Sequence, residues 1–196
     1  MAKSAASSRP AALPVRAFAM SGRSVANKAV SVTPADPAVR MALRARPDAI
    51  APLSKALGVK LPETPKSSAM NKAKTRAALW LGPDEWLVID FAGADMLGAC
   101  AGVKQLHSAV EISHRNVAIL VEGKGAEATL AAGCPQDLSL AAFPVNACSR
   151  TILGKIEVVI WRTGEQAFRV ECWRSFSAYA FDFLEDAARD AVLTVQ

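Results

Sequence analysis

Leu79-Trp-Leu-Gly-Pro-Asp-Glu-Trp-Leu-Val-Ile89 is the stretch of this 196-residue chain that says most about its fold. Two apolar runs flank Gly82-Pro83-Asp84, where the proline fixes φ for a tight turn and the aspartate side chain can accept a hydrogen bond from the backbone that follows. Two such runs joined by a short turn are typical of a β-hairpin. The stretch therefore predicts two antiparallel strands with two tryptophans to bury.

Helices and strands alternate beyond this hairpin. We expect strands near residues 109–113, 117–122, 148–153, 155–162 and 166–173, and helices near 47–57, 94–107, 126–132 and 176–188. The last helix has the clearest pattern, because apolar residues from Phe176 to Ala188 recur at helical spacing. The strand at 166–173 alternates apolar and polar side chains, which predicts one buried face. Hairpins mixed with helices indicate an α+β fold with mainly antiparallel sheets.

Charge divides the chain unevenly. Residues 1–76 hold 14 of the 23 basic residues and 3 of the 18 acidic ones, a net charge of +11, so the remainder carries −6. Residues 1–46 are rich in Ala, Ser, Pro and Arg, and their spaced prolines oppose a long helix. We therefore expect an extended basic arm over 1–46, with a short strand near 30–32, and one α+β domain over 47–196. Six basic residues of the arm are candidate partner contacts, namely Arg16, Arg23, Lys28, Arg40, Arg44 and Arg46.

Composition argues against several classes of protein. No apolar run approaches the ~18 residues that span a bilayer, and the first ten residues contain no apolar segment of a secretory signal. We therefore expect a cytoplasmic protein without membrane contact. The four cysteines lack C-x-x-C spacing and neither histidine stands near a cysteine pair, which favours reduced core thiols and no metal site.

Motifs for chemistry are weak. Ser113 and His114 are adjacent, and on a strand their side chains would point to opposite faces, so they do not suggest a catalytic triad. Gly123-Lys-Gly-Ala-Glu-Ala128 satisfies a permissive dinucleotide pattern, but no acidic residue follows at the expected distance of about 20 residues. A Gly-rich turn between a strand and a helix is the better interpretation. The sequence thus predicts no catalytic, cofactor-binding or metal-binding residue.

The Trp-rich hairpin also resembles a family signature, and three further stretches share the likeness. They are Ile112-Ser-His-Arg-Asn-Val-Ala-Ile119, Ala132-Gly-Cys-Pro-Gln-Asp-Leu138 and Phe168-Arg-Val-Glu-Cys-Trp-Arg-Ser-Phe176. From about Thr75 to its C-terminus, the chain resembles the γ subunits of heterotetrameric sarcosine oxidases. This family is related to the folate-binding aminomethyltransferases (T-proteins of glycine cleavage), so the resemblance implies an aminomethyltransferase-like fold.

The resemblance implies a four-subunit oxidoreductase. Such a complex demethylates sarcosine oxidatively to glycine and hydrogen peroxide, and passes the one-carbon unit to tetrahydrofolate as 5,10-methylenetetrahydrofolate. FAD, FMN and NAD belong to the large α and β subunits and zinc to the δ subunit, with no cofactor in the γ chain. The α, β and δ subunits would be the partners of this chain, mainly the large α subunit.

One departure from the folate enzymes stands out. Those enzymes place paired acidic residues on the strand that meets folate, whereas the stretch Leu153-Gly-Lys-Ile-Glu-Val158 retains one carboxylate, Glu157. The sequence therefore favours a non-catalytic, structural γ subunit. Two alternatives remain open: a self-standing folate-binding or aminomethyl-transfer protein, and a basic nucleic-acid-binding module, which rests on charge alone.

Overall fold

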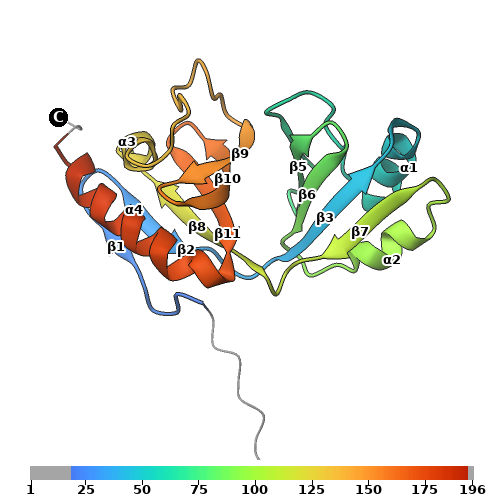
Figure 1. Ribbon diagram of the computed structural model, residues 1–196, viewed down its shortest axis with the longest axis horizontal. Coiled ribbons are helices and arrows are strands. Elements are labelled where there is room, and N and C mark those ends of the chain that lie inside the picture. Colours follow the sequence, from blue (N-terminus) through green and yellow to red (C-terminus); the bar gives the residue numbers. More distant parts are fainter. Residues whose placement is uncertain (1–18, 194–196) are drawn as a thin grey trace, which may run out of the picture.

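The computed structural model describes residues 19–193, whose strands form two antiparallel sheets in two adjacent lobes (Figure 1). The first sheet has the order β1 (Val25–Ala26), β2 (Ser31–Pro34), β8 (Asn116–Glu122), β11 (Ala167–Trp173), β10 (Ile156–Gly164) and β9 (Cys148–Leu153). The second has the order β4 (Ser68–Met70), β5 (Arg76–Gly82), β6 (Glu85–Asp90), β3 (Val39–Ala45) and β7 (His107–Glu111). This arrangement confirms the α+β prediction.

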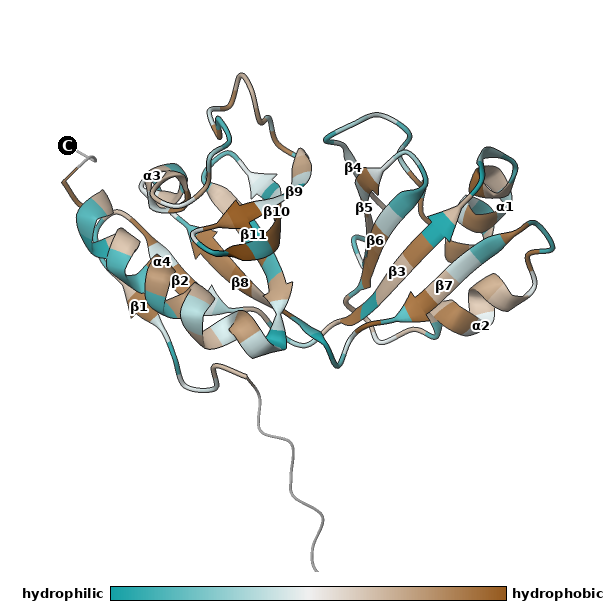
Figure 2. Ribbon diagram, viewed as in Figure 1, coloured by the Kyte–Doolittle hydropathy of each residue, from teal (hydrophilic) through white to brown (hydrophobic). Residues whose placement is uncertain are grey.

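Helices cover the outer face of each sheet. The second lobe carries α1 (Pro47–Leu57) and α2 (Met96–Ala101), and the first carries α3 (Ala126–Ala131) and α4 (Ser177–Ala191), which follows the short 3₁₀ turn η1 (Arg174–Phe176) (Figure 1). Apolar residues line the strands of both sheets, while the outward side of α4 is largely hydrophilic (Figure 2). Each lobe therefore has its own core between sheet and helices.

The two lobes repeat one plan. In the second lobe the chain runs β3-α1-β4-β5-β6-α2-β7, and the sheet order is β4-β5-β6-β3-β7. In the first lobe β8, β10 and β11 occupy the places of β3, β5 and β6. The place of β7 is taken by β2, which comes from the N-terminal part of the chain. The chain consequently crosses between the lobes twice, once between β2 and β3 and once between β7 and β8.

The predicted hairpin is β5 and β6. Trp80 pairs with Trp86, and Gly82 pairs with Glu85 at the turn. Trp86 is fully buried and its indole Nε1 donates a hydrogen bond to the Pro62 carbonyl at 2.7 Å. On the opposite face of this hairpin, Leu79 packs into a core shared by the two sheets. The hairpin therefore helps to hold the lobes together.

A second link joins the lobes at the edges of their sheets. The Cys148 backbone N–H donates to the Lys66 carbonyl at 3.1 Å, and Ser68 Oγ donates to the Asn146 carbonyl at 2.7 Å. Between this edge and the two crossings lies the shared apolar core, which includes Trp161. Packing and hydrogen bonds together therefore fix the lobes against each other.

The prediction of an extended arm outside the folded domain is wrong for residues 25–45, although the short strand expected near 30–32 is present as β2. These residues form β1, β2 and β3, and β3 lies between β6 and β7 with Met41 and Leu43 fully buried. The alternation of Met41, Leu43 and Ala45 with polar or small residues marks a strand, but the basic composition concealed it. The folded unit therefore begins well before residue 47, and residues 1–18 of the expected arm lie outside the described residues.

Two further differences concern single elements. The helix expected at 94–107 spans only Met96–Ala101, capped by Asp95, whose side chain accepts from the Gly98 N–H at 2.8 Å. The strand β11 is buried on both faces rather than one, because Arg169 and Glu171 are also buried. The final helix, Ser177–Ala191, lies where it is predicted; it carries a Glu185–Arg189 ion pair at 2.9 Å, and no side chain caps its N-terminus.

Candidate functional site

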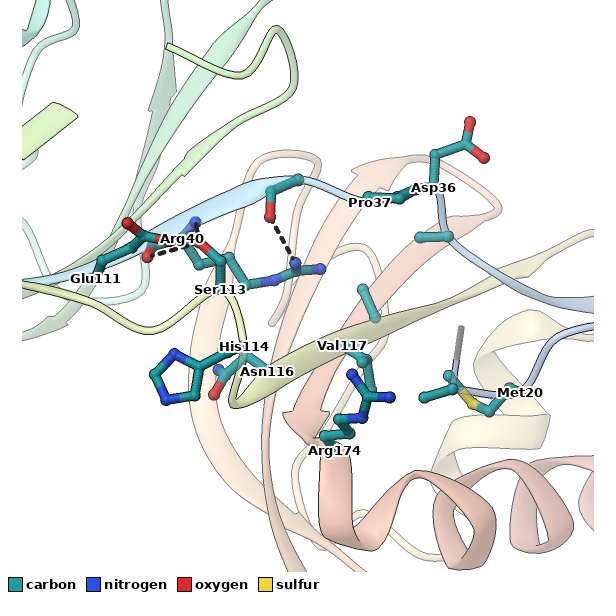
Figure 3. Close-up of a pocket in the computed structure, with 14 residues that line it drawn as sticks. Met20, Asp36, Pro37, Arg40, Glu111, Ser113, His114, Asn116, Val117 and Arg174 are labelled. Carbon is teal, nitrogen blue, oxygen red and sulfur yellow. Dashed lines mark hydrogen bonds between the residues drawn. The ribbon is translucent and has the colours of Figure 1, made fainter. Parts of the chain in front are cut away.

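A cavity lies between the two chain crossings. It has a volume of about 370 Å³ and is open to solvent on one side. Its walls are Ala19, Met20, residues 35–38, Arg40, Glu111, Ser113, His114, residues 116–118 and Arg174 (Figure 3). Small apolar groups make up much of this wall. Its polar side chains lie mainly where the crossing from β7 reaches the start of β8.

Arg40 lies at the inner side of this cavity and is only 3% exposed. Its Nε donates to Glu171 at 2.6 Å, its Nη1 donates to the Ala38 carbonyl at 2.9 Å, and its backbone N–H donates to Ser113 Oγ at 2.9 Å. The guanidinium of Arg40, from the second sheet, thus reaches across to Glu171 on the first. The two hydrogen bonds of the guanidinium fix the side chain in one orientation, and the bond to Ser113 holds the backbone of Arg40.

Glu171 joins two arginines. Its second carboxylate oxygen accepts from Arg169 Nε at 2.8 Å, and all three side chains are almost completely buried. The guanidinium of Arg169 also lies 5.3 Å from the centre of the Phe91 ring in the other lobe. The cluster Arg40–Glu171–Arg169, here called the interlobe triad, is therefore a charged link between the sheets. Desolvated charges of this kind are costly unless they are paired.

The six predicted partner contacts do not form one surface. Arg23 pairs with Asp182 at 2.5 Å and with Glu185 at 3.2 Å on α4. Arg44 is exposed and pairs with Glu85 at 2.8 Å, whereas Arg40 is buried in the interlobe triad. Lys28 and Arg46 are exposed at separate places, and Arg16 lies outside the described residues. Arg40 is thus unavailable as a surface contact in this chain, and the roles of the others stay predictions.

Ser113 and His114 are the adjacent serine and histidine considered above as a catalytic pair. Ser113 and His114 lie in the turn before β8 rather than on a strand, and Ser113 Oγ accepts the hydrogen bond from Arg40. His114 is exposed. Among residues 19–193, no three His, Cys, Asp or Glu side chains are grouped as a metal ion would need. In this geometry Ser113 serves as a hydrogen-bond partner of the Arg40 backbone.

All four cysteines are free and buried, as the sequence predicts. Burial raises the pKa of the Cys148 thiol to about 12. Burial, together with the neighbouring negative charge of Glu171, raises the pKa of Cys172 to about 12 as well. A nucleophilic cysteine needs a thiolate, which a raised pKa disfavours. These thiols are therefore packing groups.

The glycine-rich segment makes a close backbone contact. Gly123 has φ +122°, and a Cβ built there would lie 2.4 Å from the carbonyl oxygen of Ala29. The Gly125 N–H donates to that same carbonyl at 2.9 Å. The following helix α3 has six residues. The glycines thus allow the N-terminal segment to lie against the start of α3, which supports a structural interpretation of this motif.

Glu157, the single carboxylate of the stretch compared with folate enzymes, is on β10. Its side chain is 56% exposed, and Arg150 lies 4.0 Å away. The same stretch forms the hairpin turn at Gly154, where the residue adopts φ +59°. Sequence reasoning found this hairpin but missed the interlobe triad, because an alternating Arg and Glu on a strand is usually a solvent-facing pattern. The buried residues of β3, the strand that carries Arg40, could have been predicted from the alternation of Met41, Leu43 and Ala45 with polar or small residues.

Comparisons with known proteins agree with one another. The model of the sarcosine oxidase, gamma subunit family matches residues 42–190. A sarcosine oxidase subunit gamma from Corynebacterium sp. (strain U-96) is 34% identical over 176 residues, covering 87% of this chain and 85% of the relative. The corresponding protein of Corynebacterium sp. (strain P-1) is 35% identical over 155 residues, 76% of this chain and 75% of the relative.

Solved structures give the same result at the level of the fold. A chain of the heterotetrameric sarcosine oxidase from Corynebacterium sp. U-96, in complex with pyrrole 2-carboxylate, has a TM-score of 0.79 and 31% identity, covering 86% of this chain and 88% of that one. The glycine cleavage system aminomethyltransferase T from Bartonella henselae has a TM-score of 0.56 at 14% identity, covering 80% of this chain and 45% of that one. The second likeness shows a shared fold alone.

Proposed function

The chain belongs to the sarcosine oxidase gamma subunit family, and from this membership we propose that it is the γ subunit of a heterotetrameric sarcosine oxidase. The observation that carries the proposal is the 34% identity over most of both chains, together with a family match that spans nearly all of both lobes. The aminomethyltransferase-like fold is consistent with this role but does not itself specify an activity.

The proposed complex demethylates sarcosine oxidatively to glycine and hydrogen peroxide, with tetrahydrofolate receiving the one-carbon unit. Within it, this chain has a structural and non-catalytic role. Two observations support this role. Arg40 and Glu171 form an ion pair that joins the lobes, and Ser113 accepts a hydrogen bond from the Arg40 backbone. The thiols of Cys148 and Cys172 are buried, and their pKa values are raised. These groups contribute to a rigid unit that another subunit can bind.

The proposal assigns the cofactors to other subunits. FAD, FMN and NAD would be held by the α and β subunits and zinc by the δ subunit, and the complex would work in the bacterial cytoplasm. This chain would contact mainly the α subunit, with the exposed Lys28, Arg44 and Arg46 as candidate contacts. In a separate observation, no helix among residues 19–193 is long and apolar enough to cross a membrane.

The test is reconstitution by omission. The chain is purified alone and then combined with the α, β and δ subunits of the same organism, with sarcosine-dependent hydrogen peroxide production as the readout. We expect the isolated chain to be colourless and inactive, and the four-subunit mixture to assemble and to oxidise sarcosine. A stoichiometric flavin spectrum in the isolated chain, or sarcosine turnover by it alone, would contradict the non-catalytic role. Failure to associate with the other subunits would contradict the proposal as a whole.

A further inference from the structure

One nitrogen of the Arg40 guanidinium opens into the cavity at the chain crossings. Its Nε and Nη1 are engaged with Glu171 and with the Ala38 carbonyl, and no described residue accepts a hydrogen bond from its Nη2. Because the other contacts hold the planar group in place, the direction of Nη2 is fixed as well. A fixed guanidinium N–H group in a nearly buried side chain is a preorganised donor for an anion.

The charge of the interlobe triad is unbalanced. Two guanidinium groups share the single carboxylate of Glu171, which leaves a net charge of +1 in a buried setting. Arg169 Nη2 is buried and has no hydrogen-bond partner. A low-dielectric environment strengthens the attraction between such a cluster and a nearby negative charge. Of these three residues, Arg40 is the one that lines the cavity, so an anion bound there would be paired through Arg40.

The wall of the cavity determines what kind of anion fits. Met20 and Val117 offer apolar surface to the cavity (Figure 3), and Ala35 also lines it. The carboxylate of Asp36 is exposed and points away from the other labelled polar groups, and Glu111 is exposed at the opposite end (Figure 3). Arg174 lines the same cavity, so these acidic residues are offset in part by a basic one, and the cation held in a fixed orientation in the wall is Arg40. A single negative charge attached to an apolar body matches both features.

We propose that the cavity at the chain crossings is a binding site for a small carboxylic acid, with its carboxylate on Arg40 Nη2 and its apolar part against Met20, Ala35 and Val117. This role goes beyond the subunit function proposed above and does not depend on it. Asn116, which is 8% exposed and lines the same cavity, lies within the site as a second polar group. The described walls of the site come from both chain crossings of this polypeptide.

The test is a titration of the ¹⁵N-labelled full-length chain with benzoate, followed by NMR at the amides of Val117 and Ala118 and at Arg40 Nε. Benzamide, which has the same shape without the charge, is the matched ligand. We expect saturable shifts with benzoate and binding of benzamide weaker by at least about tenfold, which is about 1.4 kcal/mol. Equal binding of the two ligands, or no saturable shift with benzoate, would overturn the proposal.

The variants are chosen to keep the fold intact. Arg40→Gln removes the donor but disturbs the interlobe triad, so the decisive variant is Ala35→Leu, which fills the cavity without changing a charge. The matched control is Ala101→Leu, the same substitution at an exposed position of α2 that does not line the cavity. We expect Ala35→Leu to abolish benzoate binding and Ala101→Leu to retain it. Unchanged binding by Ala35→Leu would show that benzoate binds at another place.

A final arm of the experiment distinguishes a free acid from a carboxylate of a partner protein. The titration is repeated on the assembled oxidase complex carrying the labelled chain. Retention of benzoate binding in the complex supports a small-molecule site. Complete loss of binding on assembly would overturn the small-molecule proposal, because it would mean that a partner chain fills the cavity.

Discussion

Glu171 is the residue on which the joint between the lobes depends most, since its carboxylate contacts both Arg40 and Arg169. Glu171→Gln would leave two buried guanidinium groups without their counter-charge. We expect the free energy of unfolding to fall by about 3–5 kcal/mol, the range typical of removing one partner from a buried ion pair. Chemical denaturation followed by tryptophan fluorescence measures this change.

Glu157→Gln is the matched control, because Glu157 is a carboxylate on the neighbouring strand β10 but is 56% exposed. Substitutions at exposed positions typically change stability by no more than about 0.5 kcal/mol. Equal effects of the two substitutions, or a stable Glu171→Gln protein, would contradict the structural importance of the interlobe triad.

The cysteine thiols give a second prediction at the residue scale. Because burial raises the pKa values of Cys148 and Cys172 from 9.0 to about 12, the native chain keeps these protons at a pH where the unfolded chain loses them. Their contribution to stability is therefore constant below about pH 9 and declines as pH rises from 9 toward 12. At pH 8 we expect a thiol reagent to modify these cysteines only after denaturant is added. Rapid modification of the native chain would disprove their burial.

At the scale of elements, the sequence predicts most strands and helices because their patterns are local. The hairpin of β5 and β6 follows from Gly82-Pro83-Asp84, and α1 follows from Pro47 at its first turn and from Gly58, which ends it at φ +63°. The strand β3 was missed because its basic residues resemble a solvated arm. The double burial of β11 was missed because its second face is covered by the other lobe, which local periodicity does not reveal.

Gly123→Ala tests the junction between β8 and α3. An alanine there would have to adopt φ +122° and would place its Cβ 2.4 Å from the Ala29 carbonyl oxygen. We expect a loss of about 1–3 kcal/mol in unfolding free energy, as for other residues forced into a sparsely populated backbone region. Thermal or chemical unfolding of the purified variant measures it.

Gly102→Ala serves as the control for this prediction. Gly102 follows α2 with φ −80°, and an added Cβ would meet no atom within 4 Å. We expect Gly102→Ala to be neutral or to stabilise the chain by about 0.4–1 kcal/mol, because alanine reduces the entropy of the unfolded state. If Gly123→Ala were equally harmless, the close packing of the N-terminal segment against α3 would be refuted.

At the scale of the whole molecule, the arrangement of the two lobes could not be derived from local pattern. The strand β2 pairs with β8, which lies some ninety residues later in the chain, as the pairing of Val32 with Val121 shows. Such pairing depends on tertiary contacts rather than on the sequence near each strand. The candidate site has the same origin, since Arg40 and Glu171 meet only after both lobes have formed.

The central claim, that this chain is a subunit of a heterotetrameric oxidase, is tested most directly by native mass spectrometry. The tagged chain is coexpressed with the α, β and δ subunits from the same organism and the intact assembly is weighed. We predict one species containing one copy of each of the four chains, with sarcosine-dependent production of hydrogen peroxide by the same sample. Recovery of the tagged chain alone, alongside a complete and active complex that lacks it, would contradict the claim.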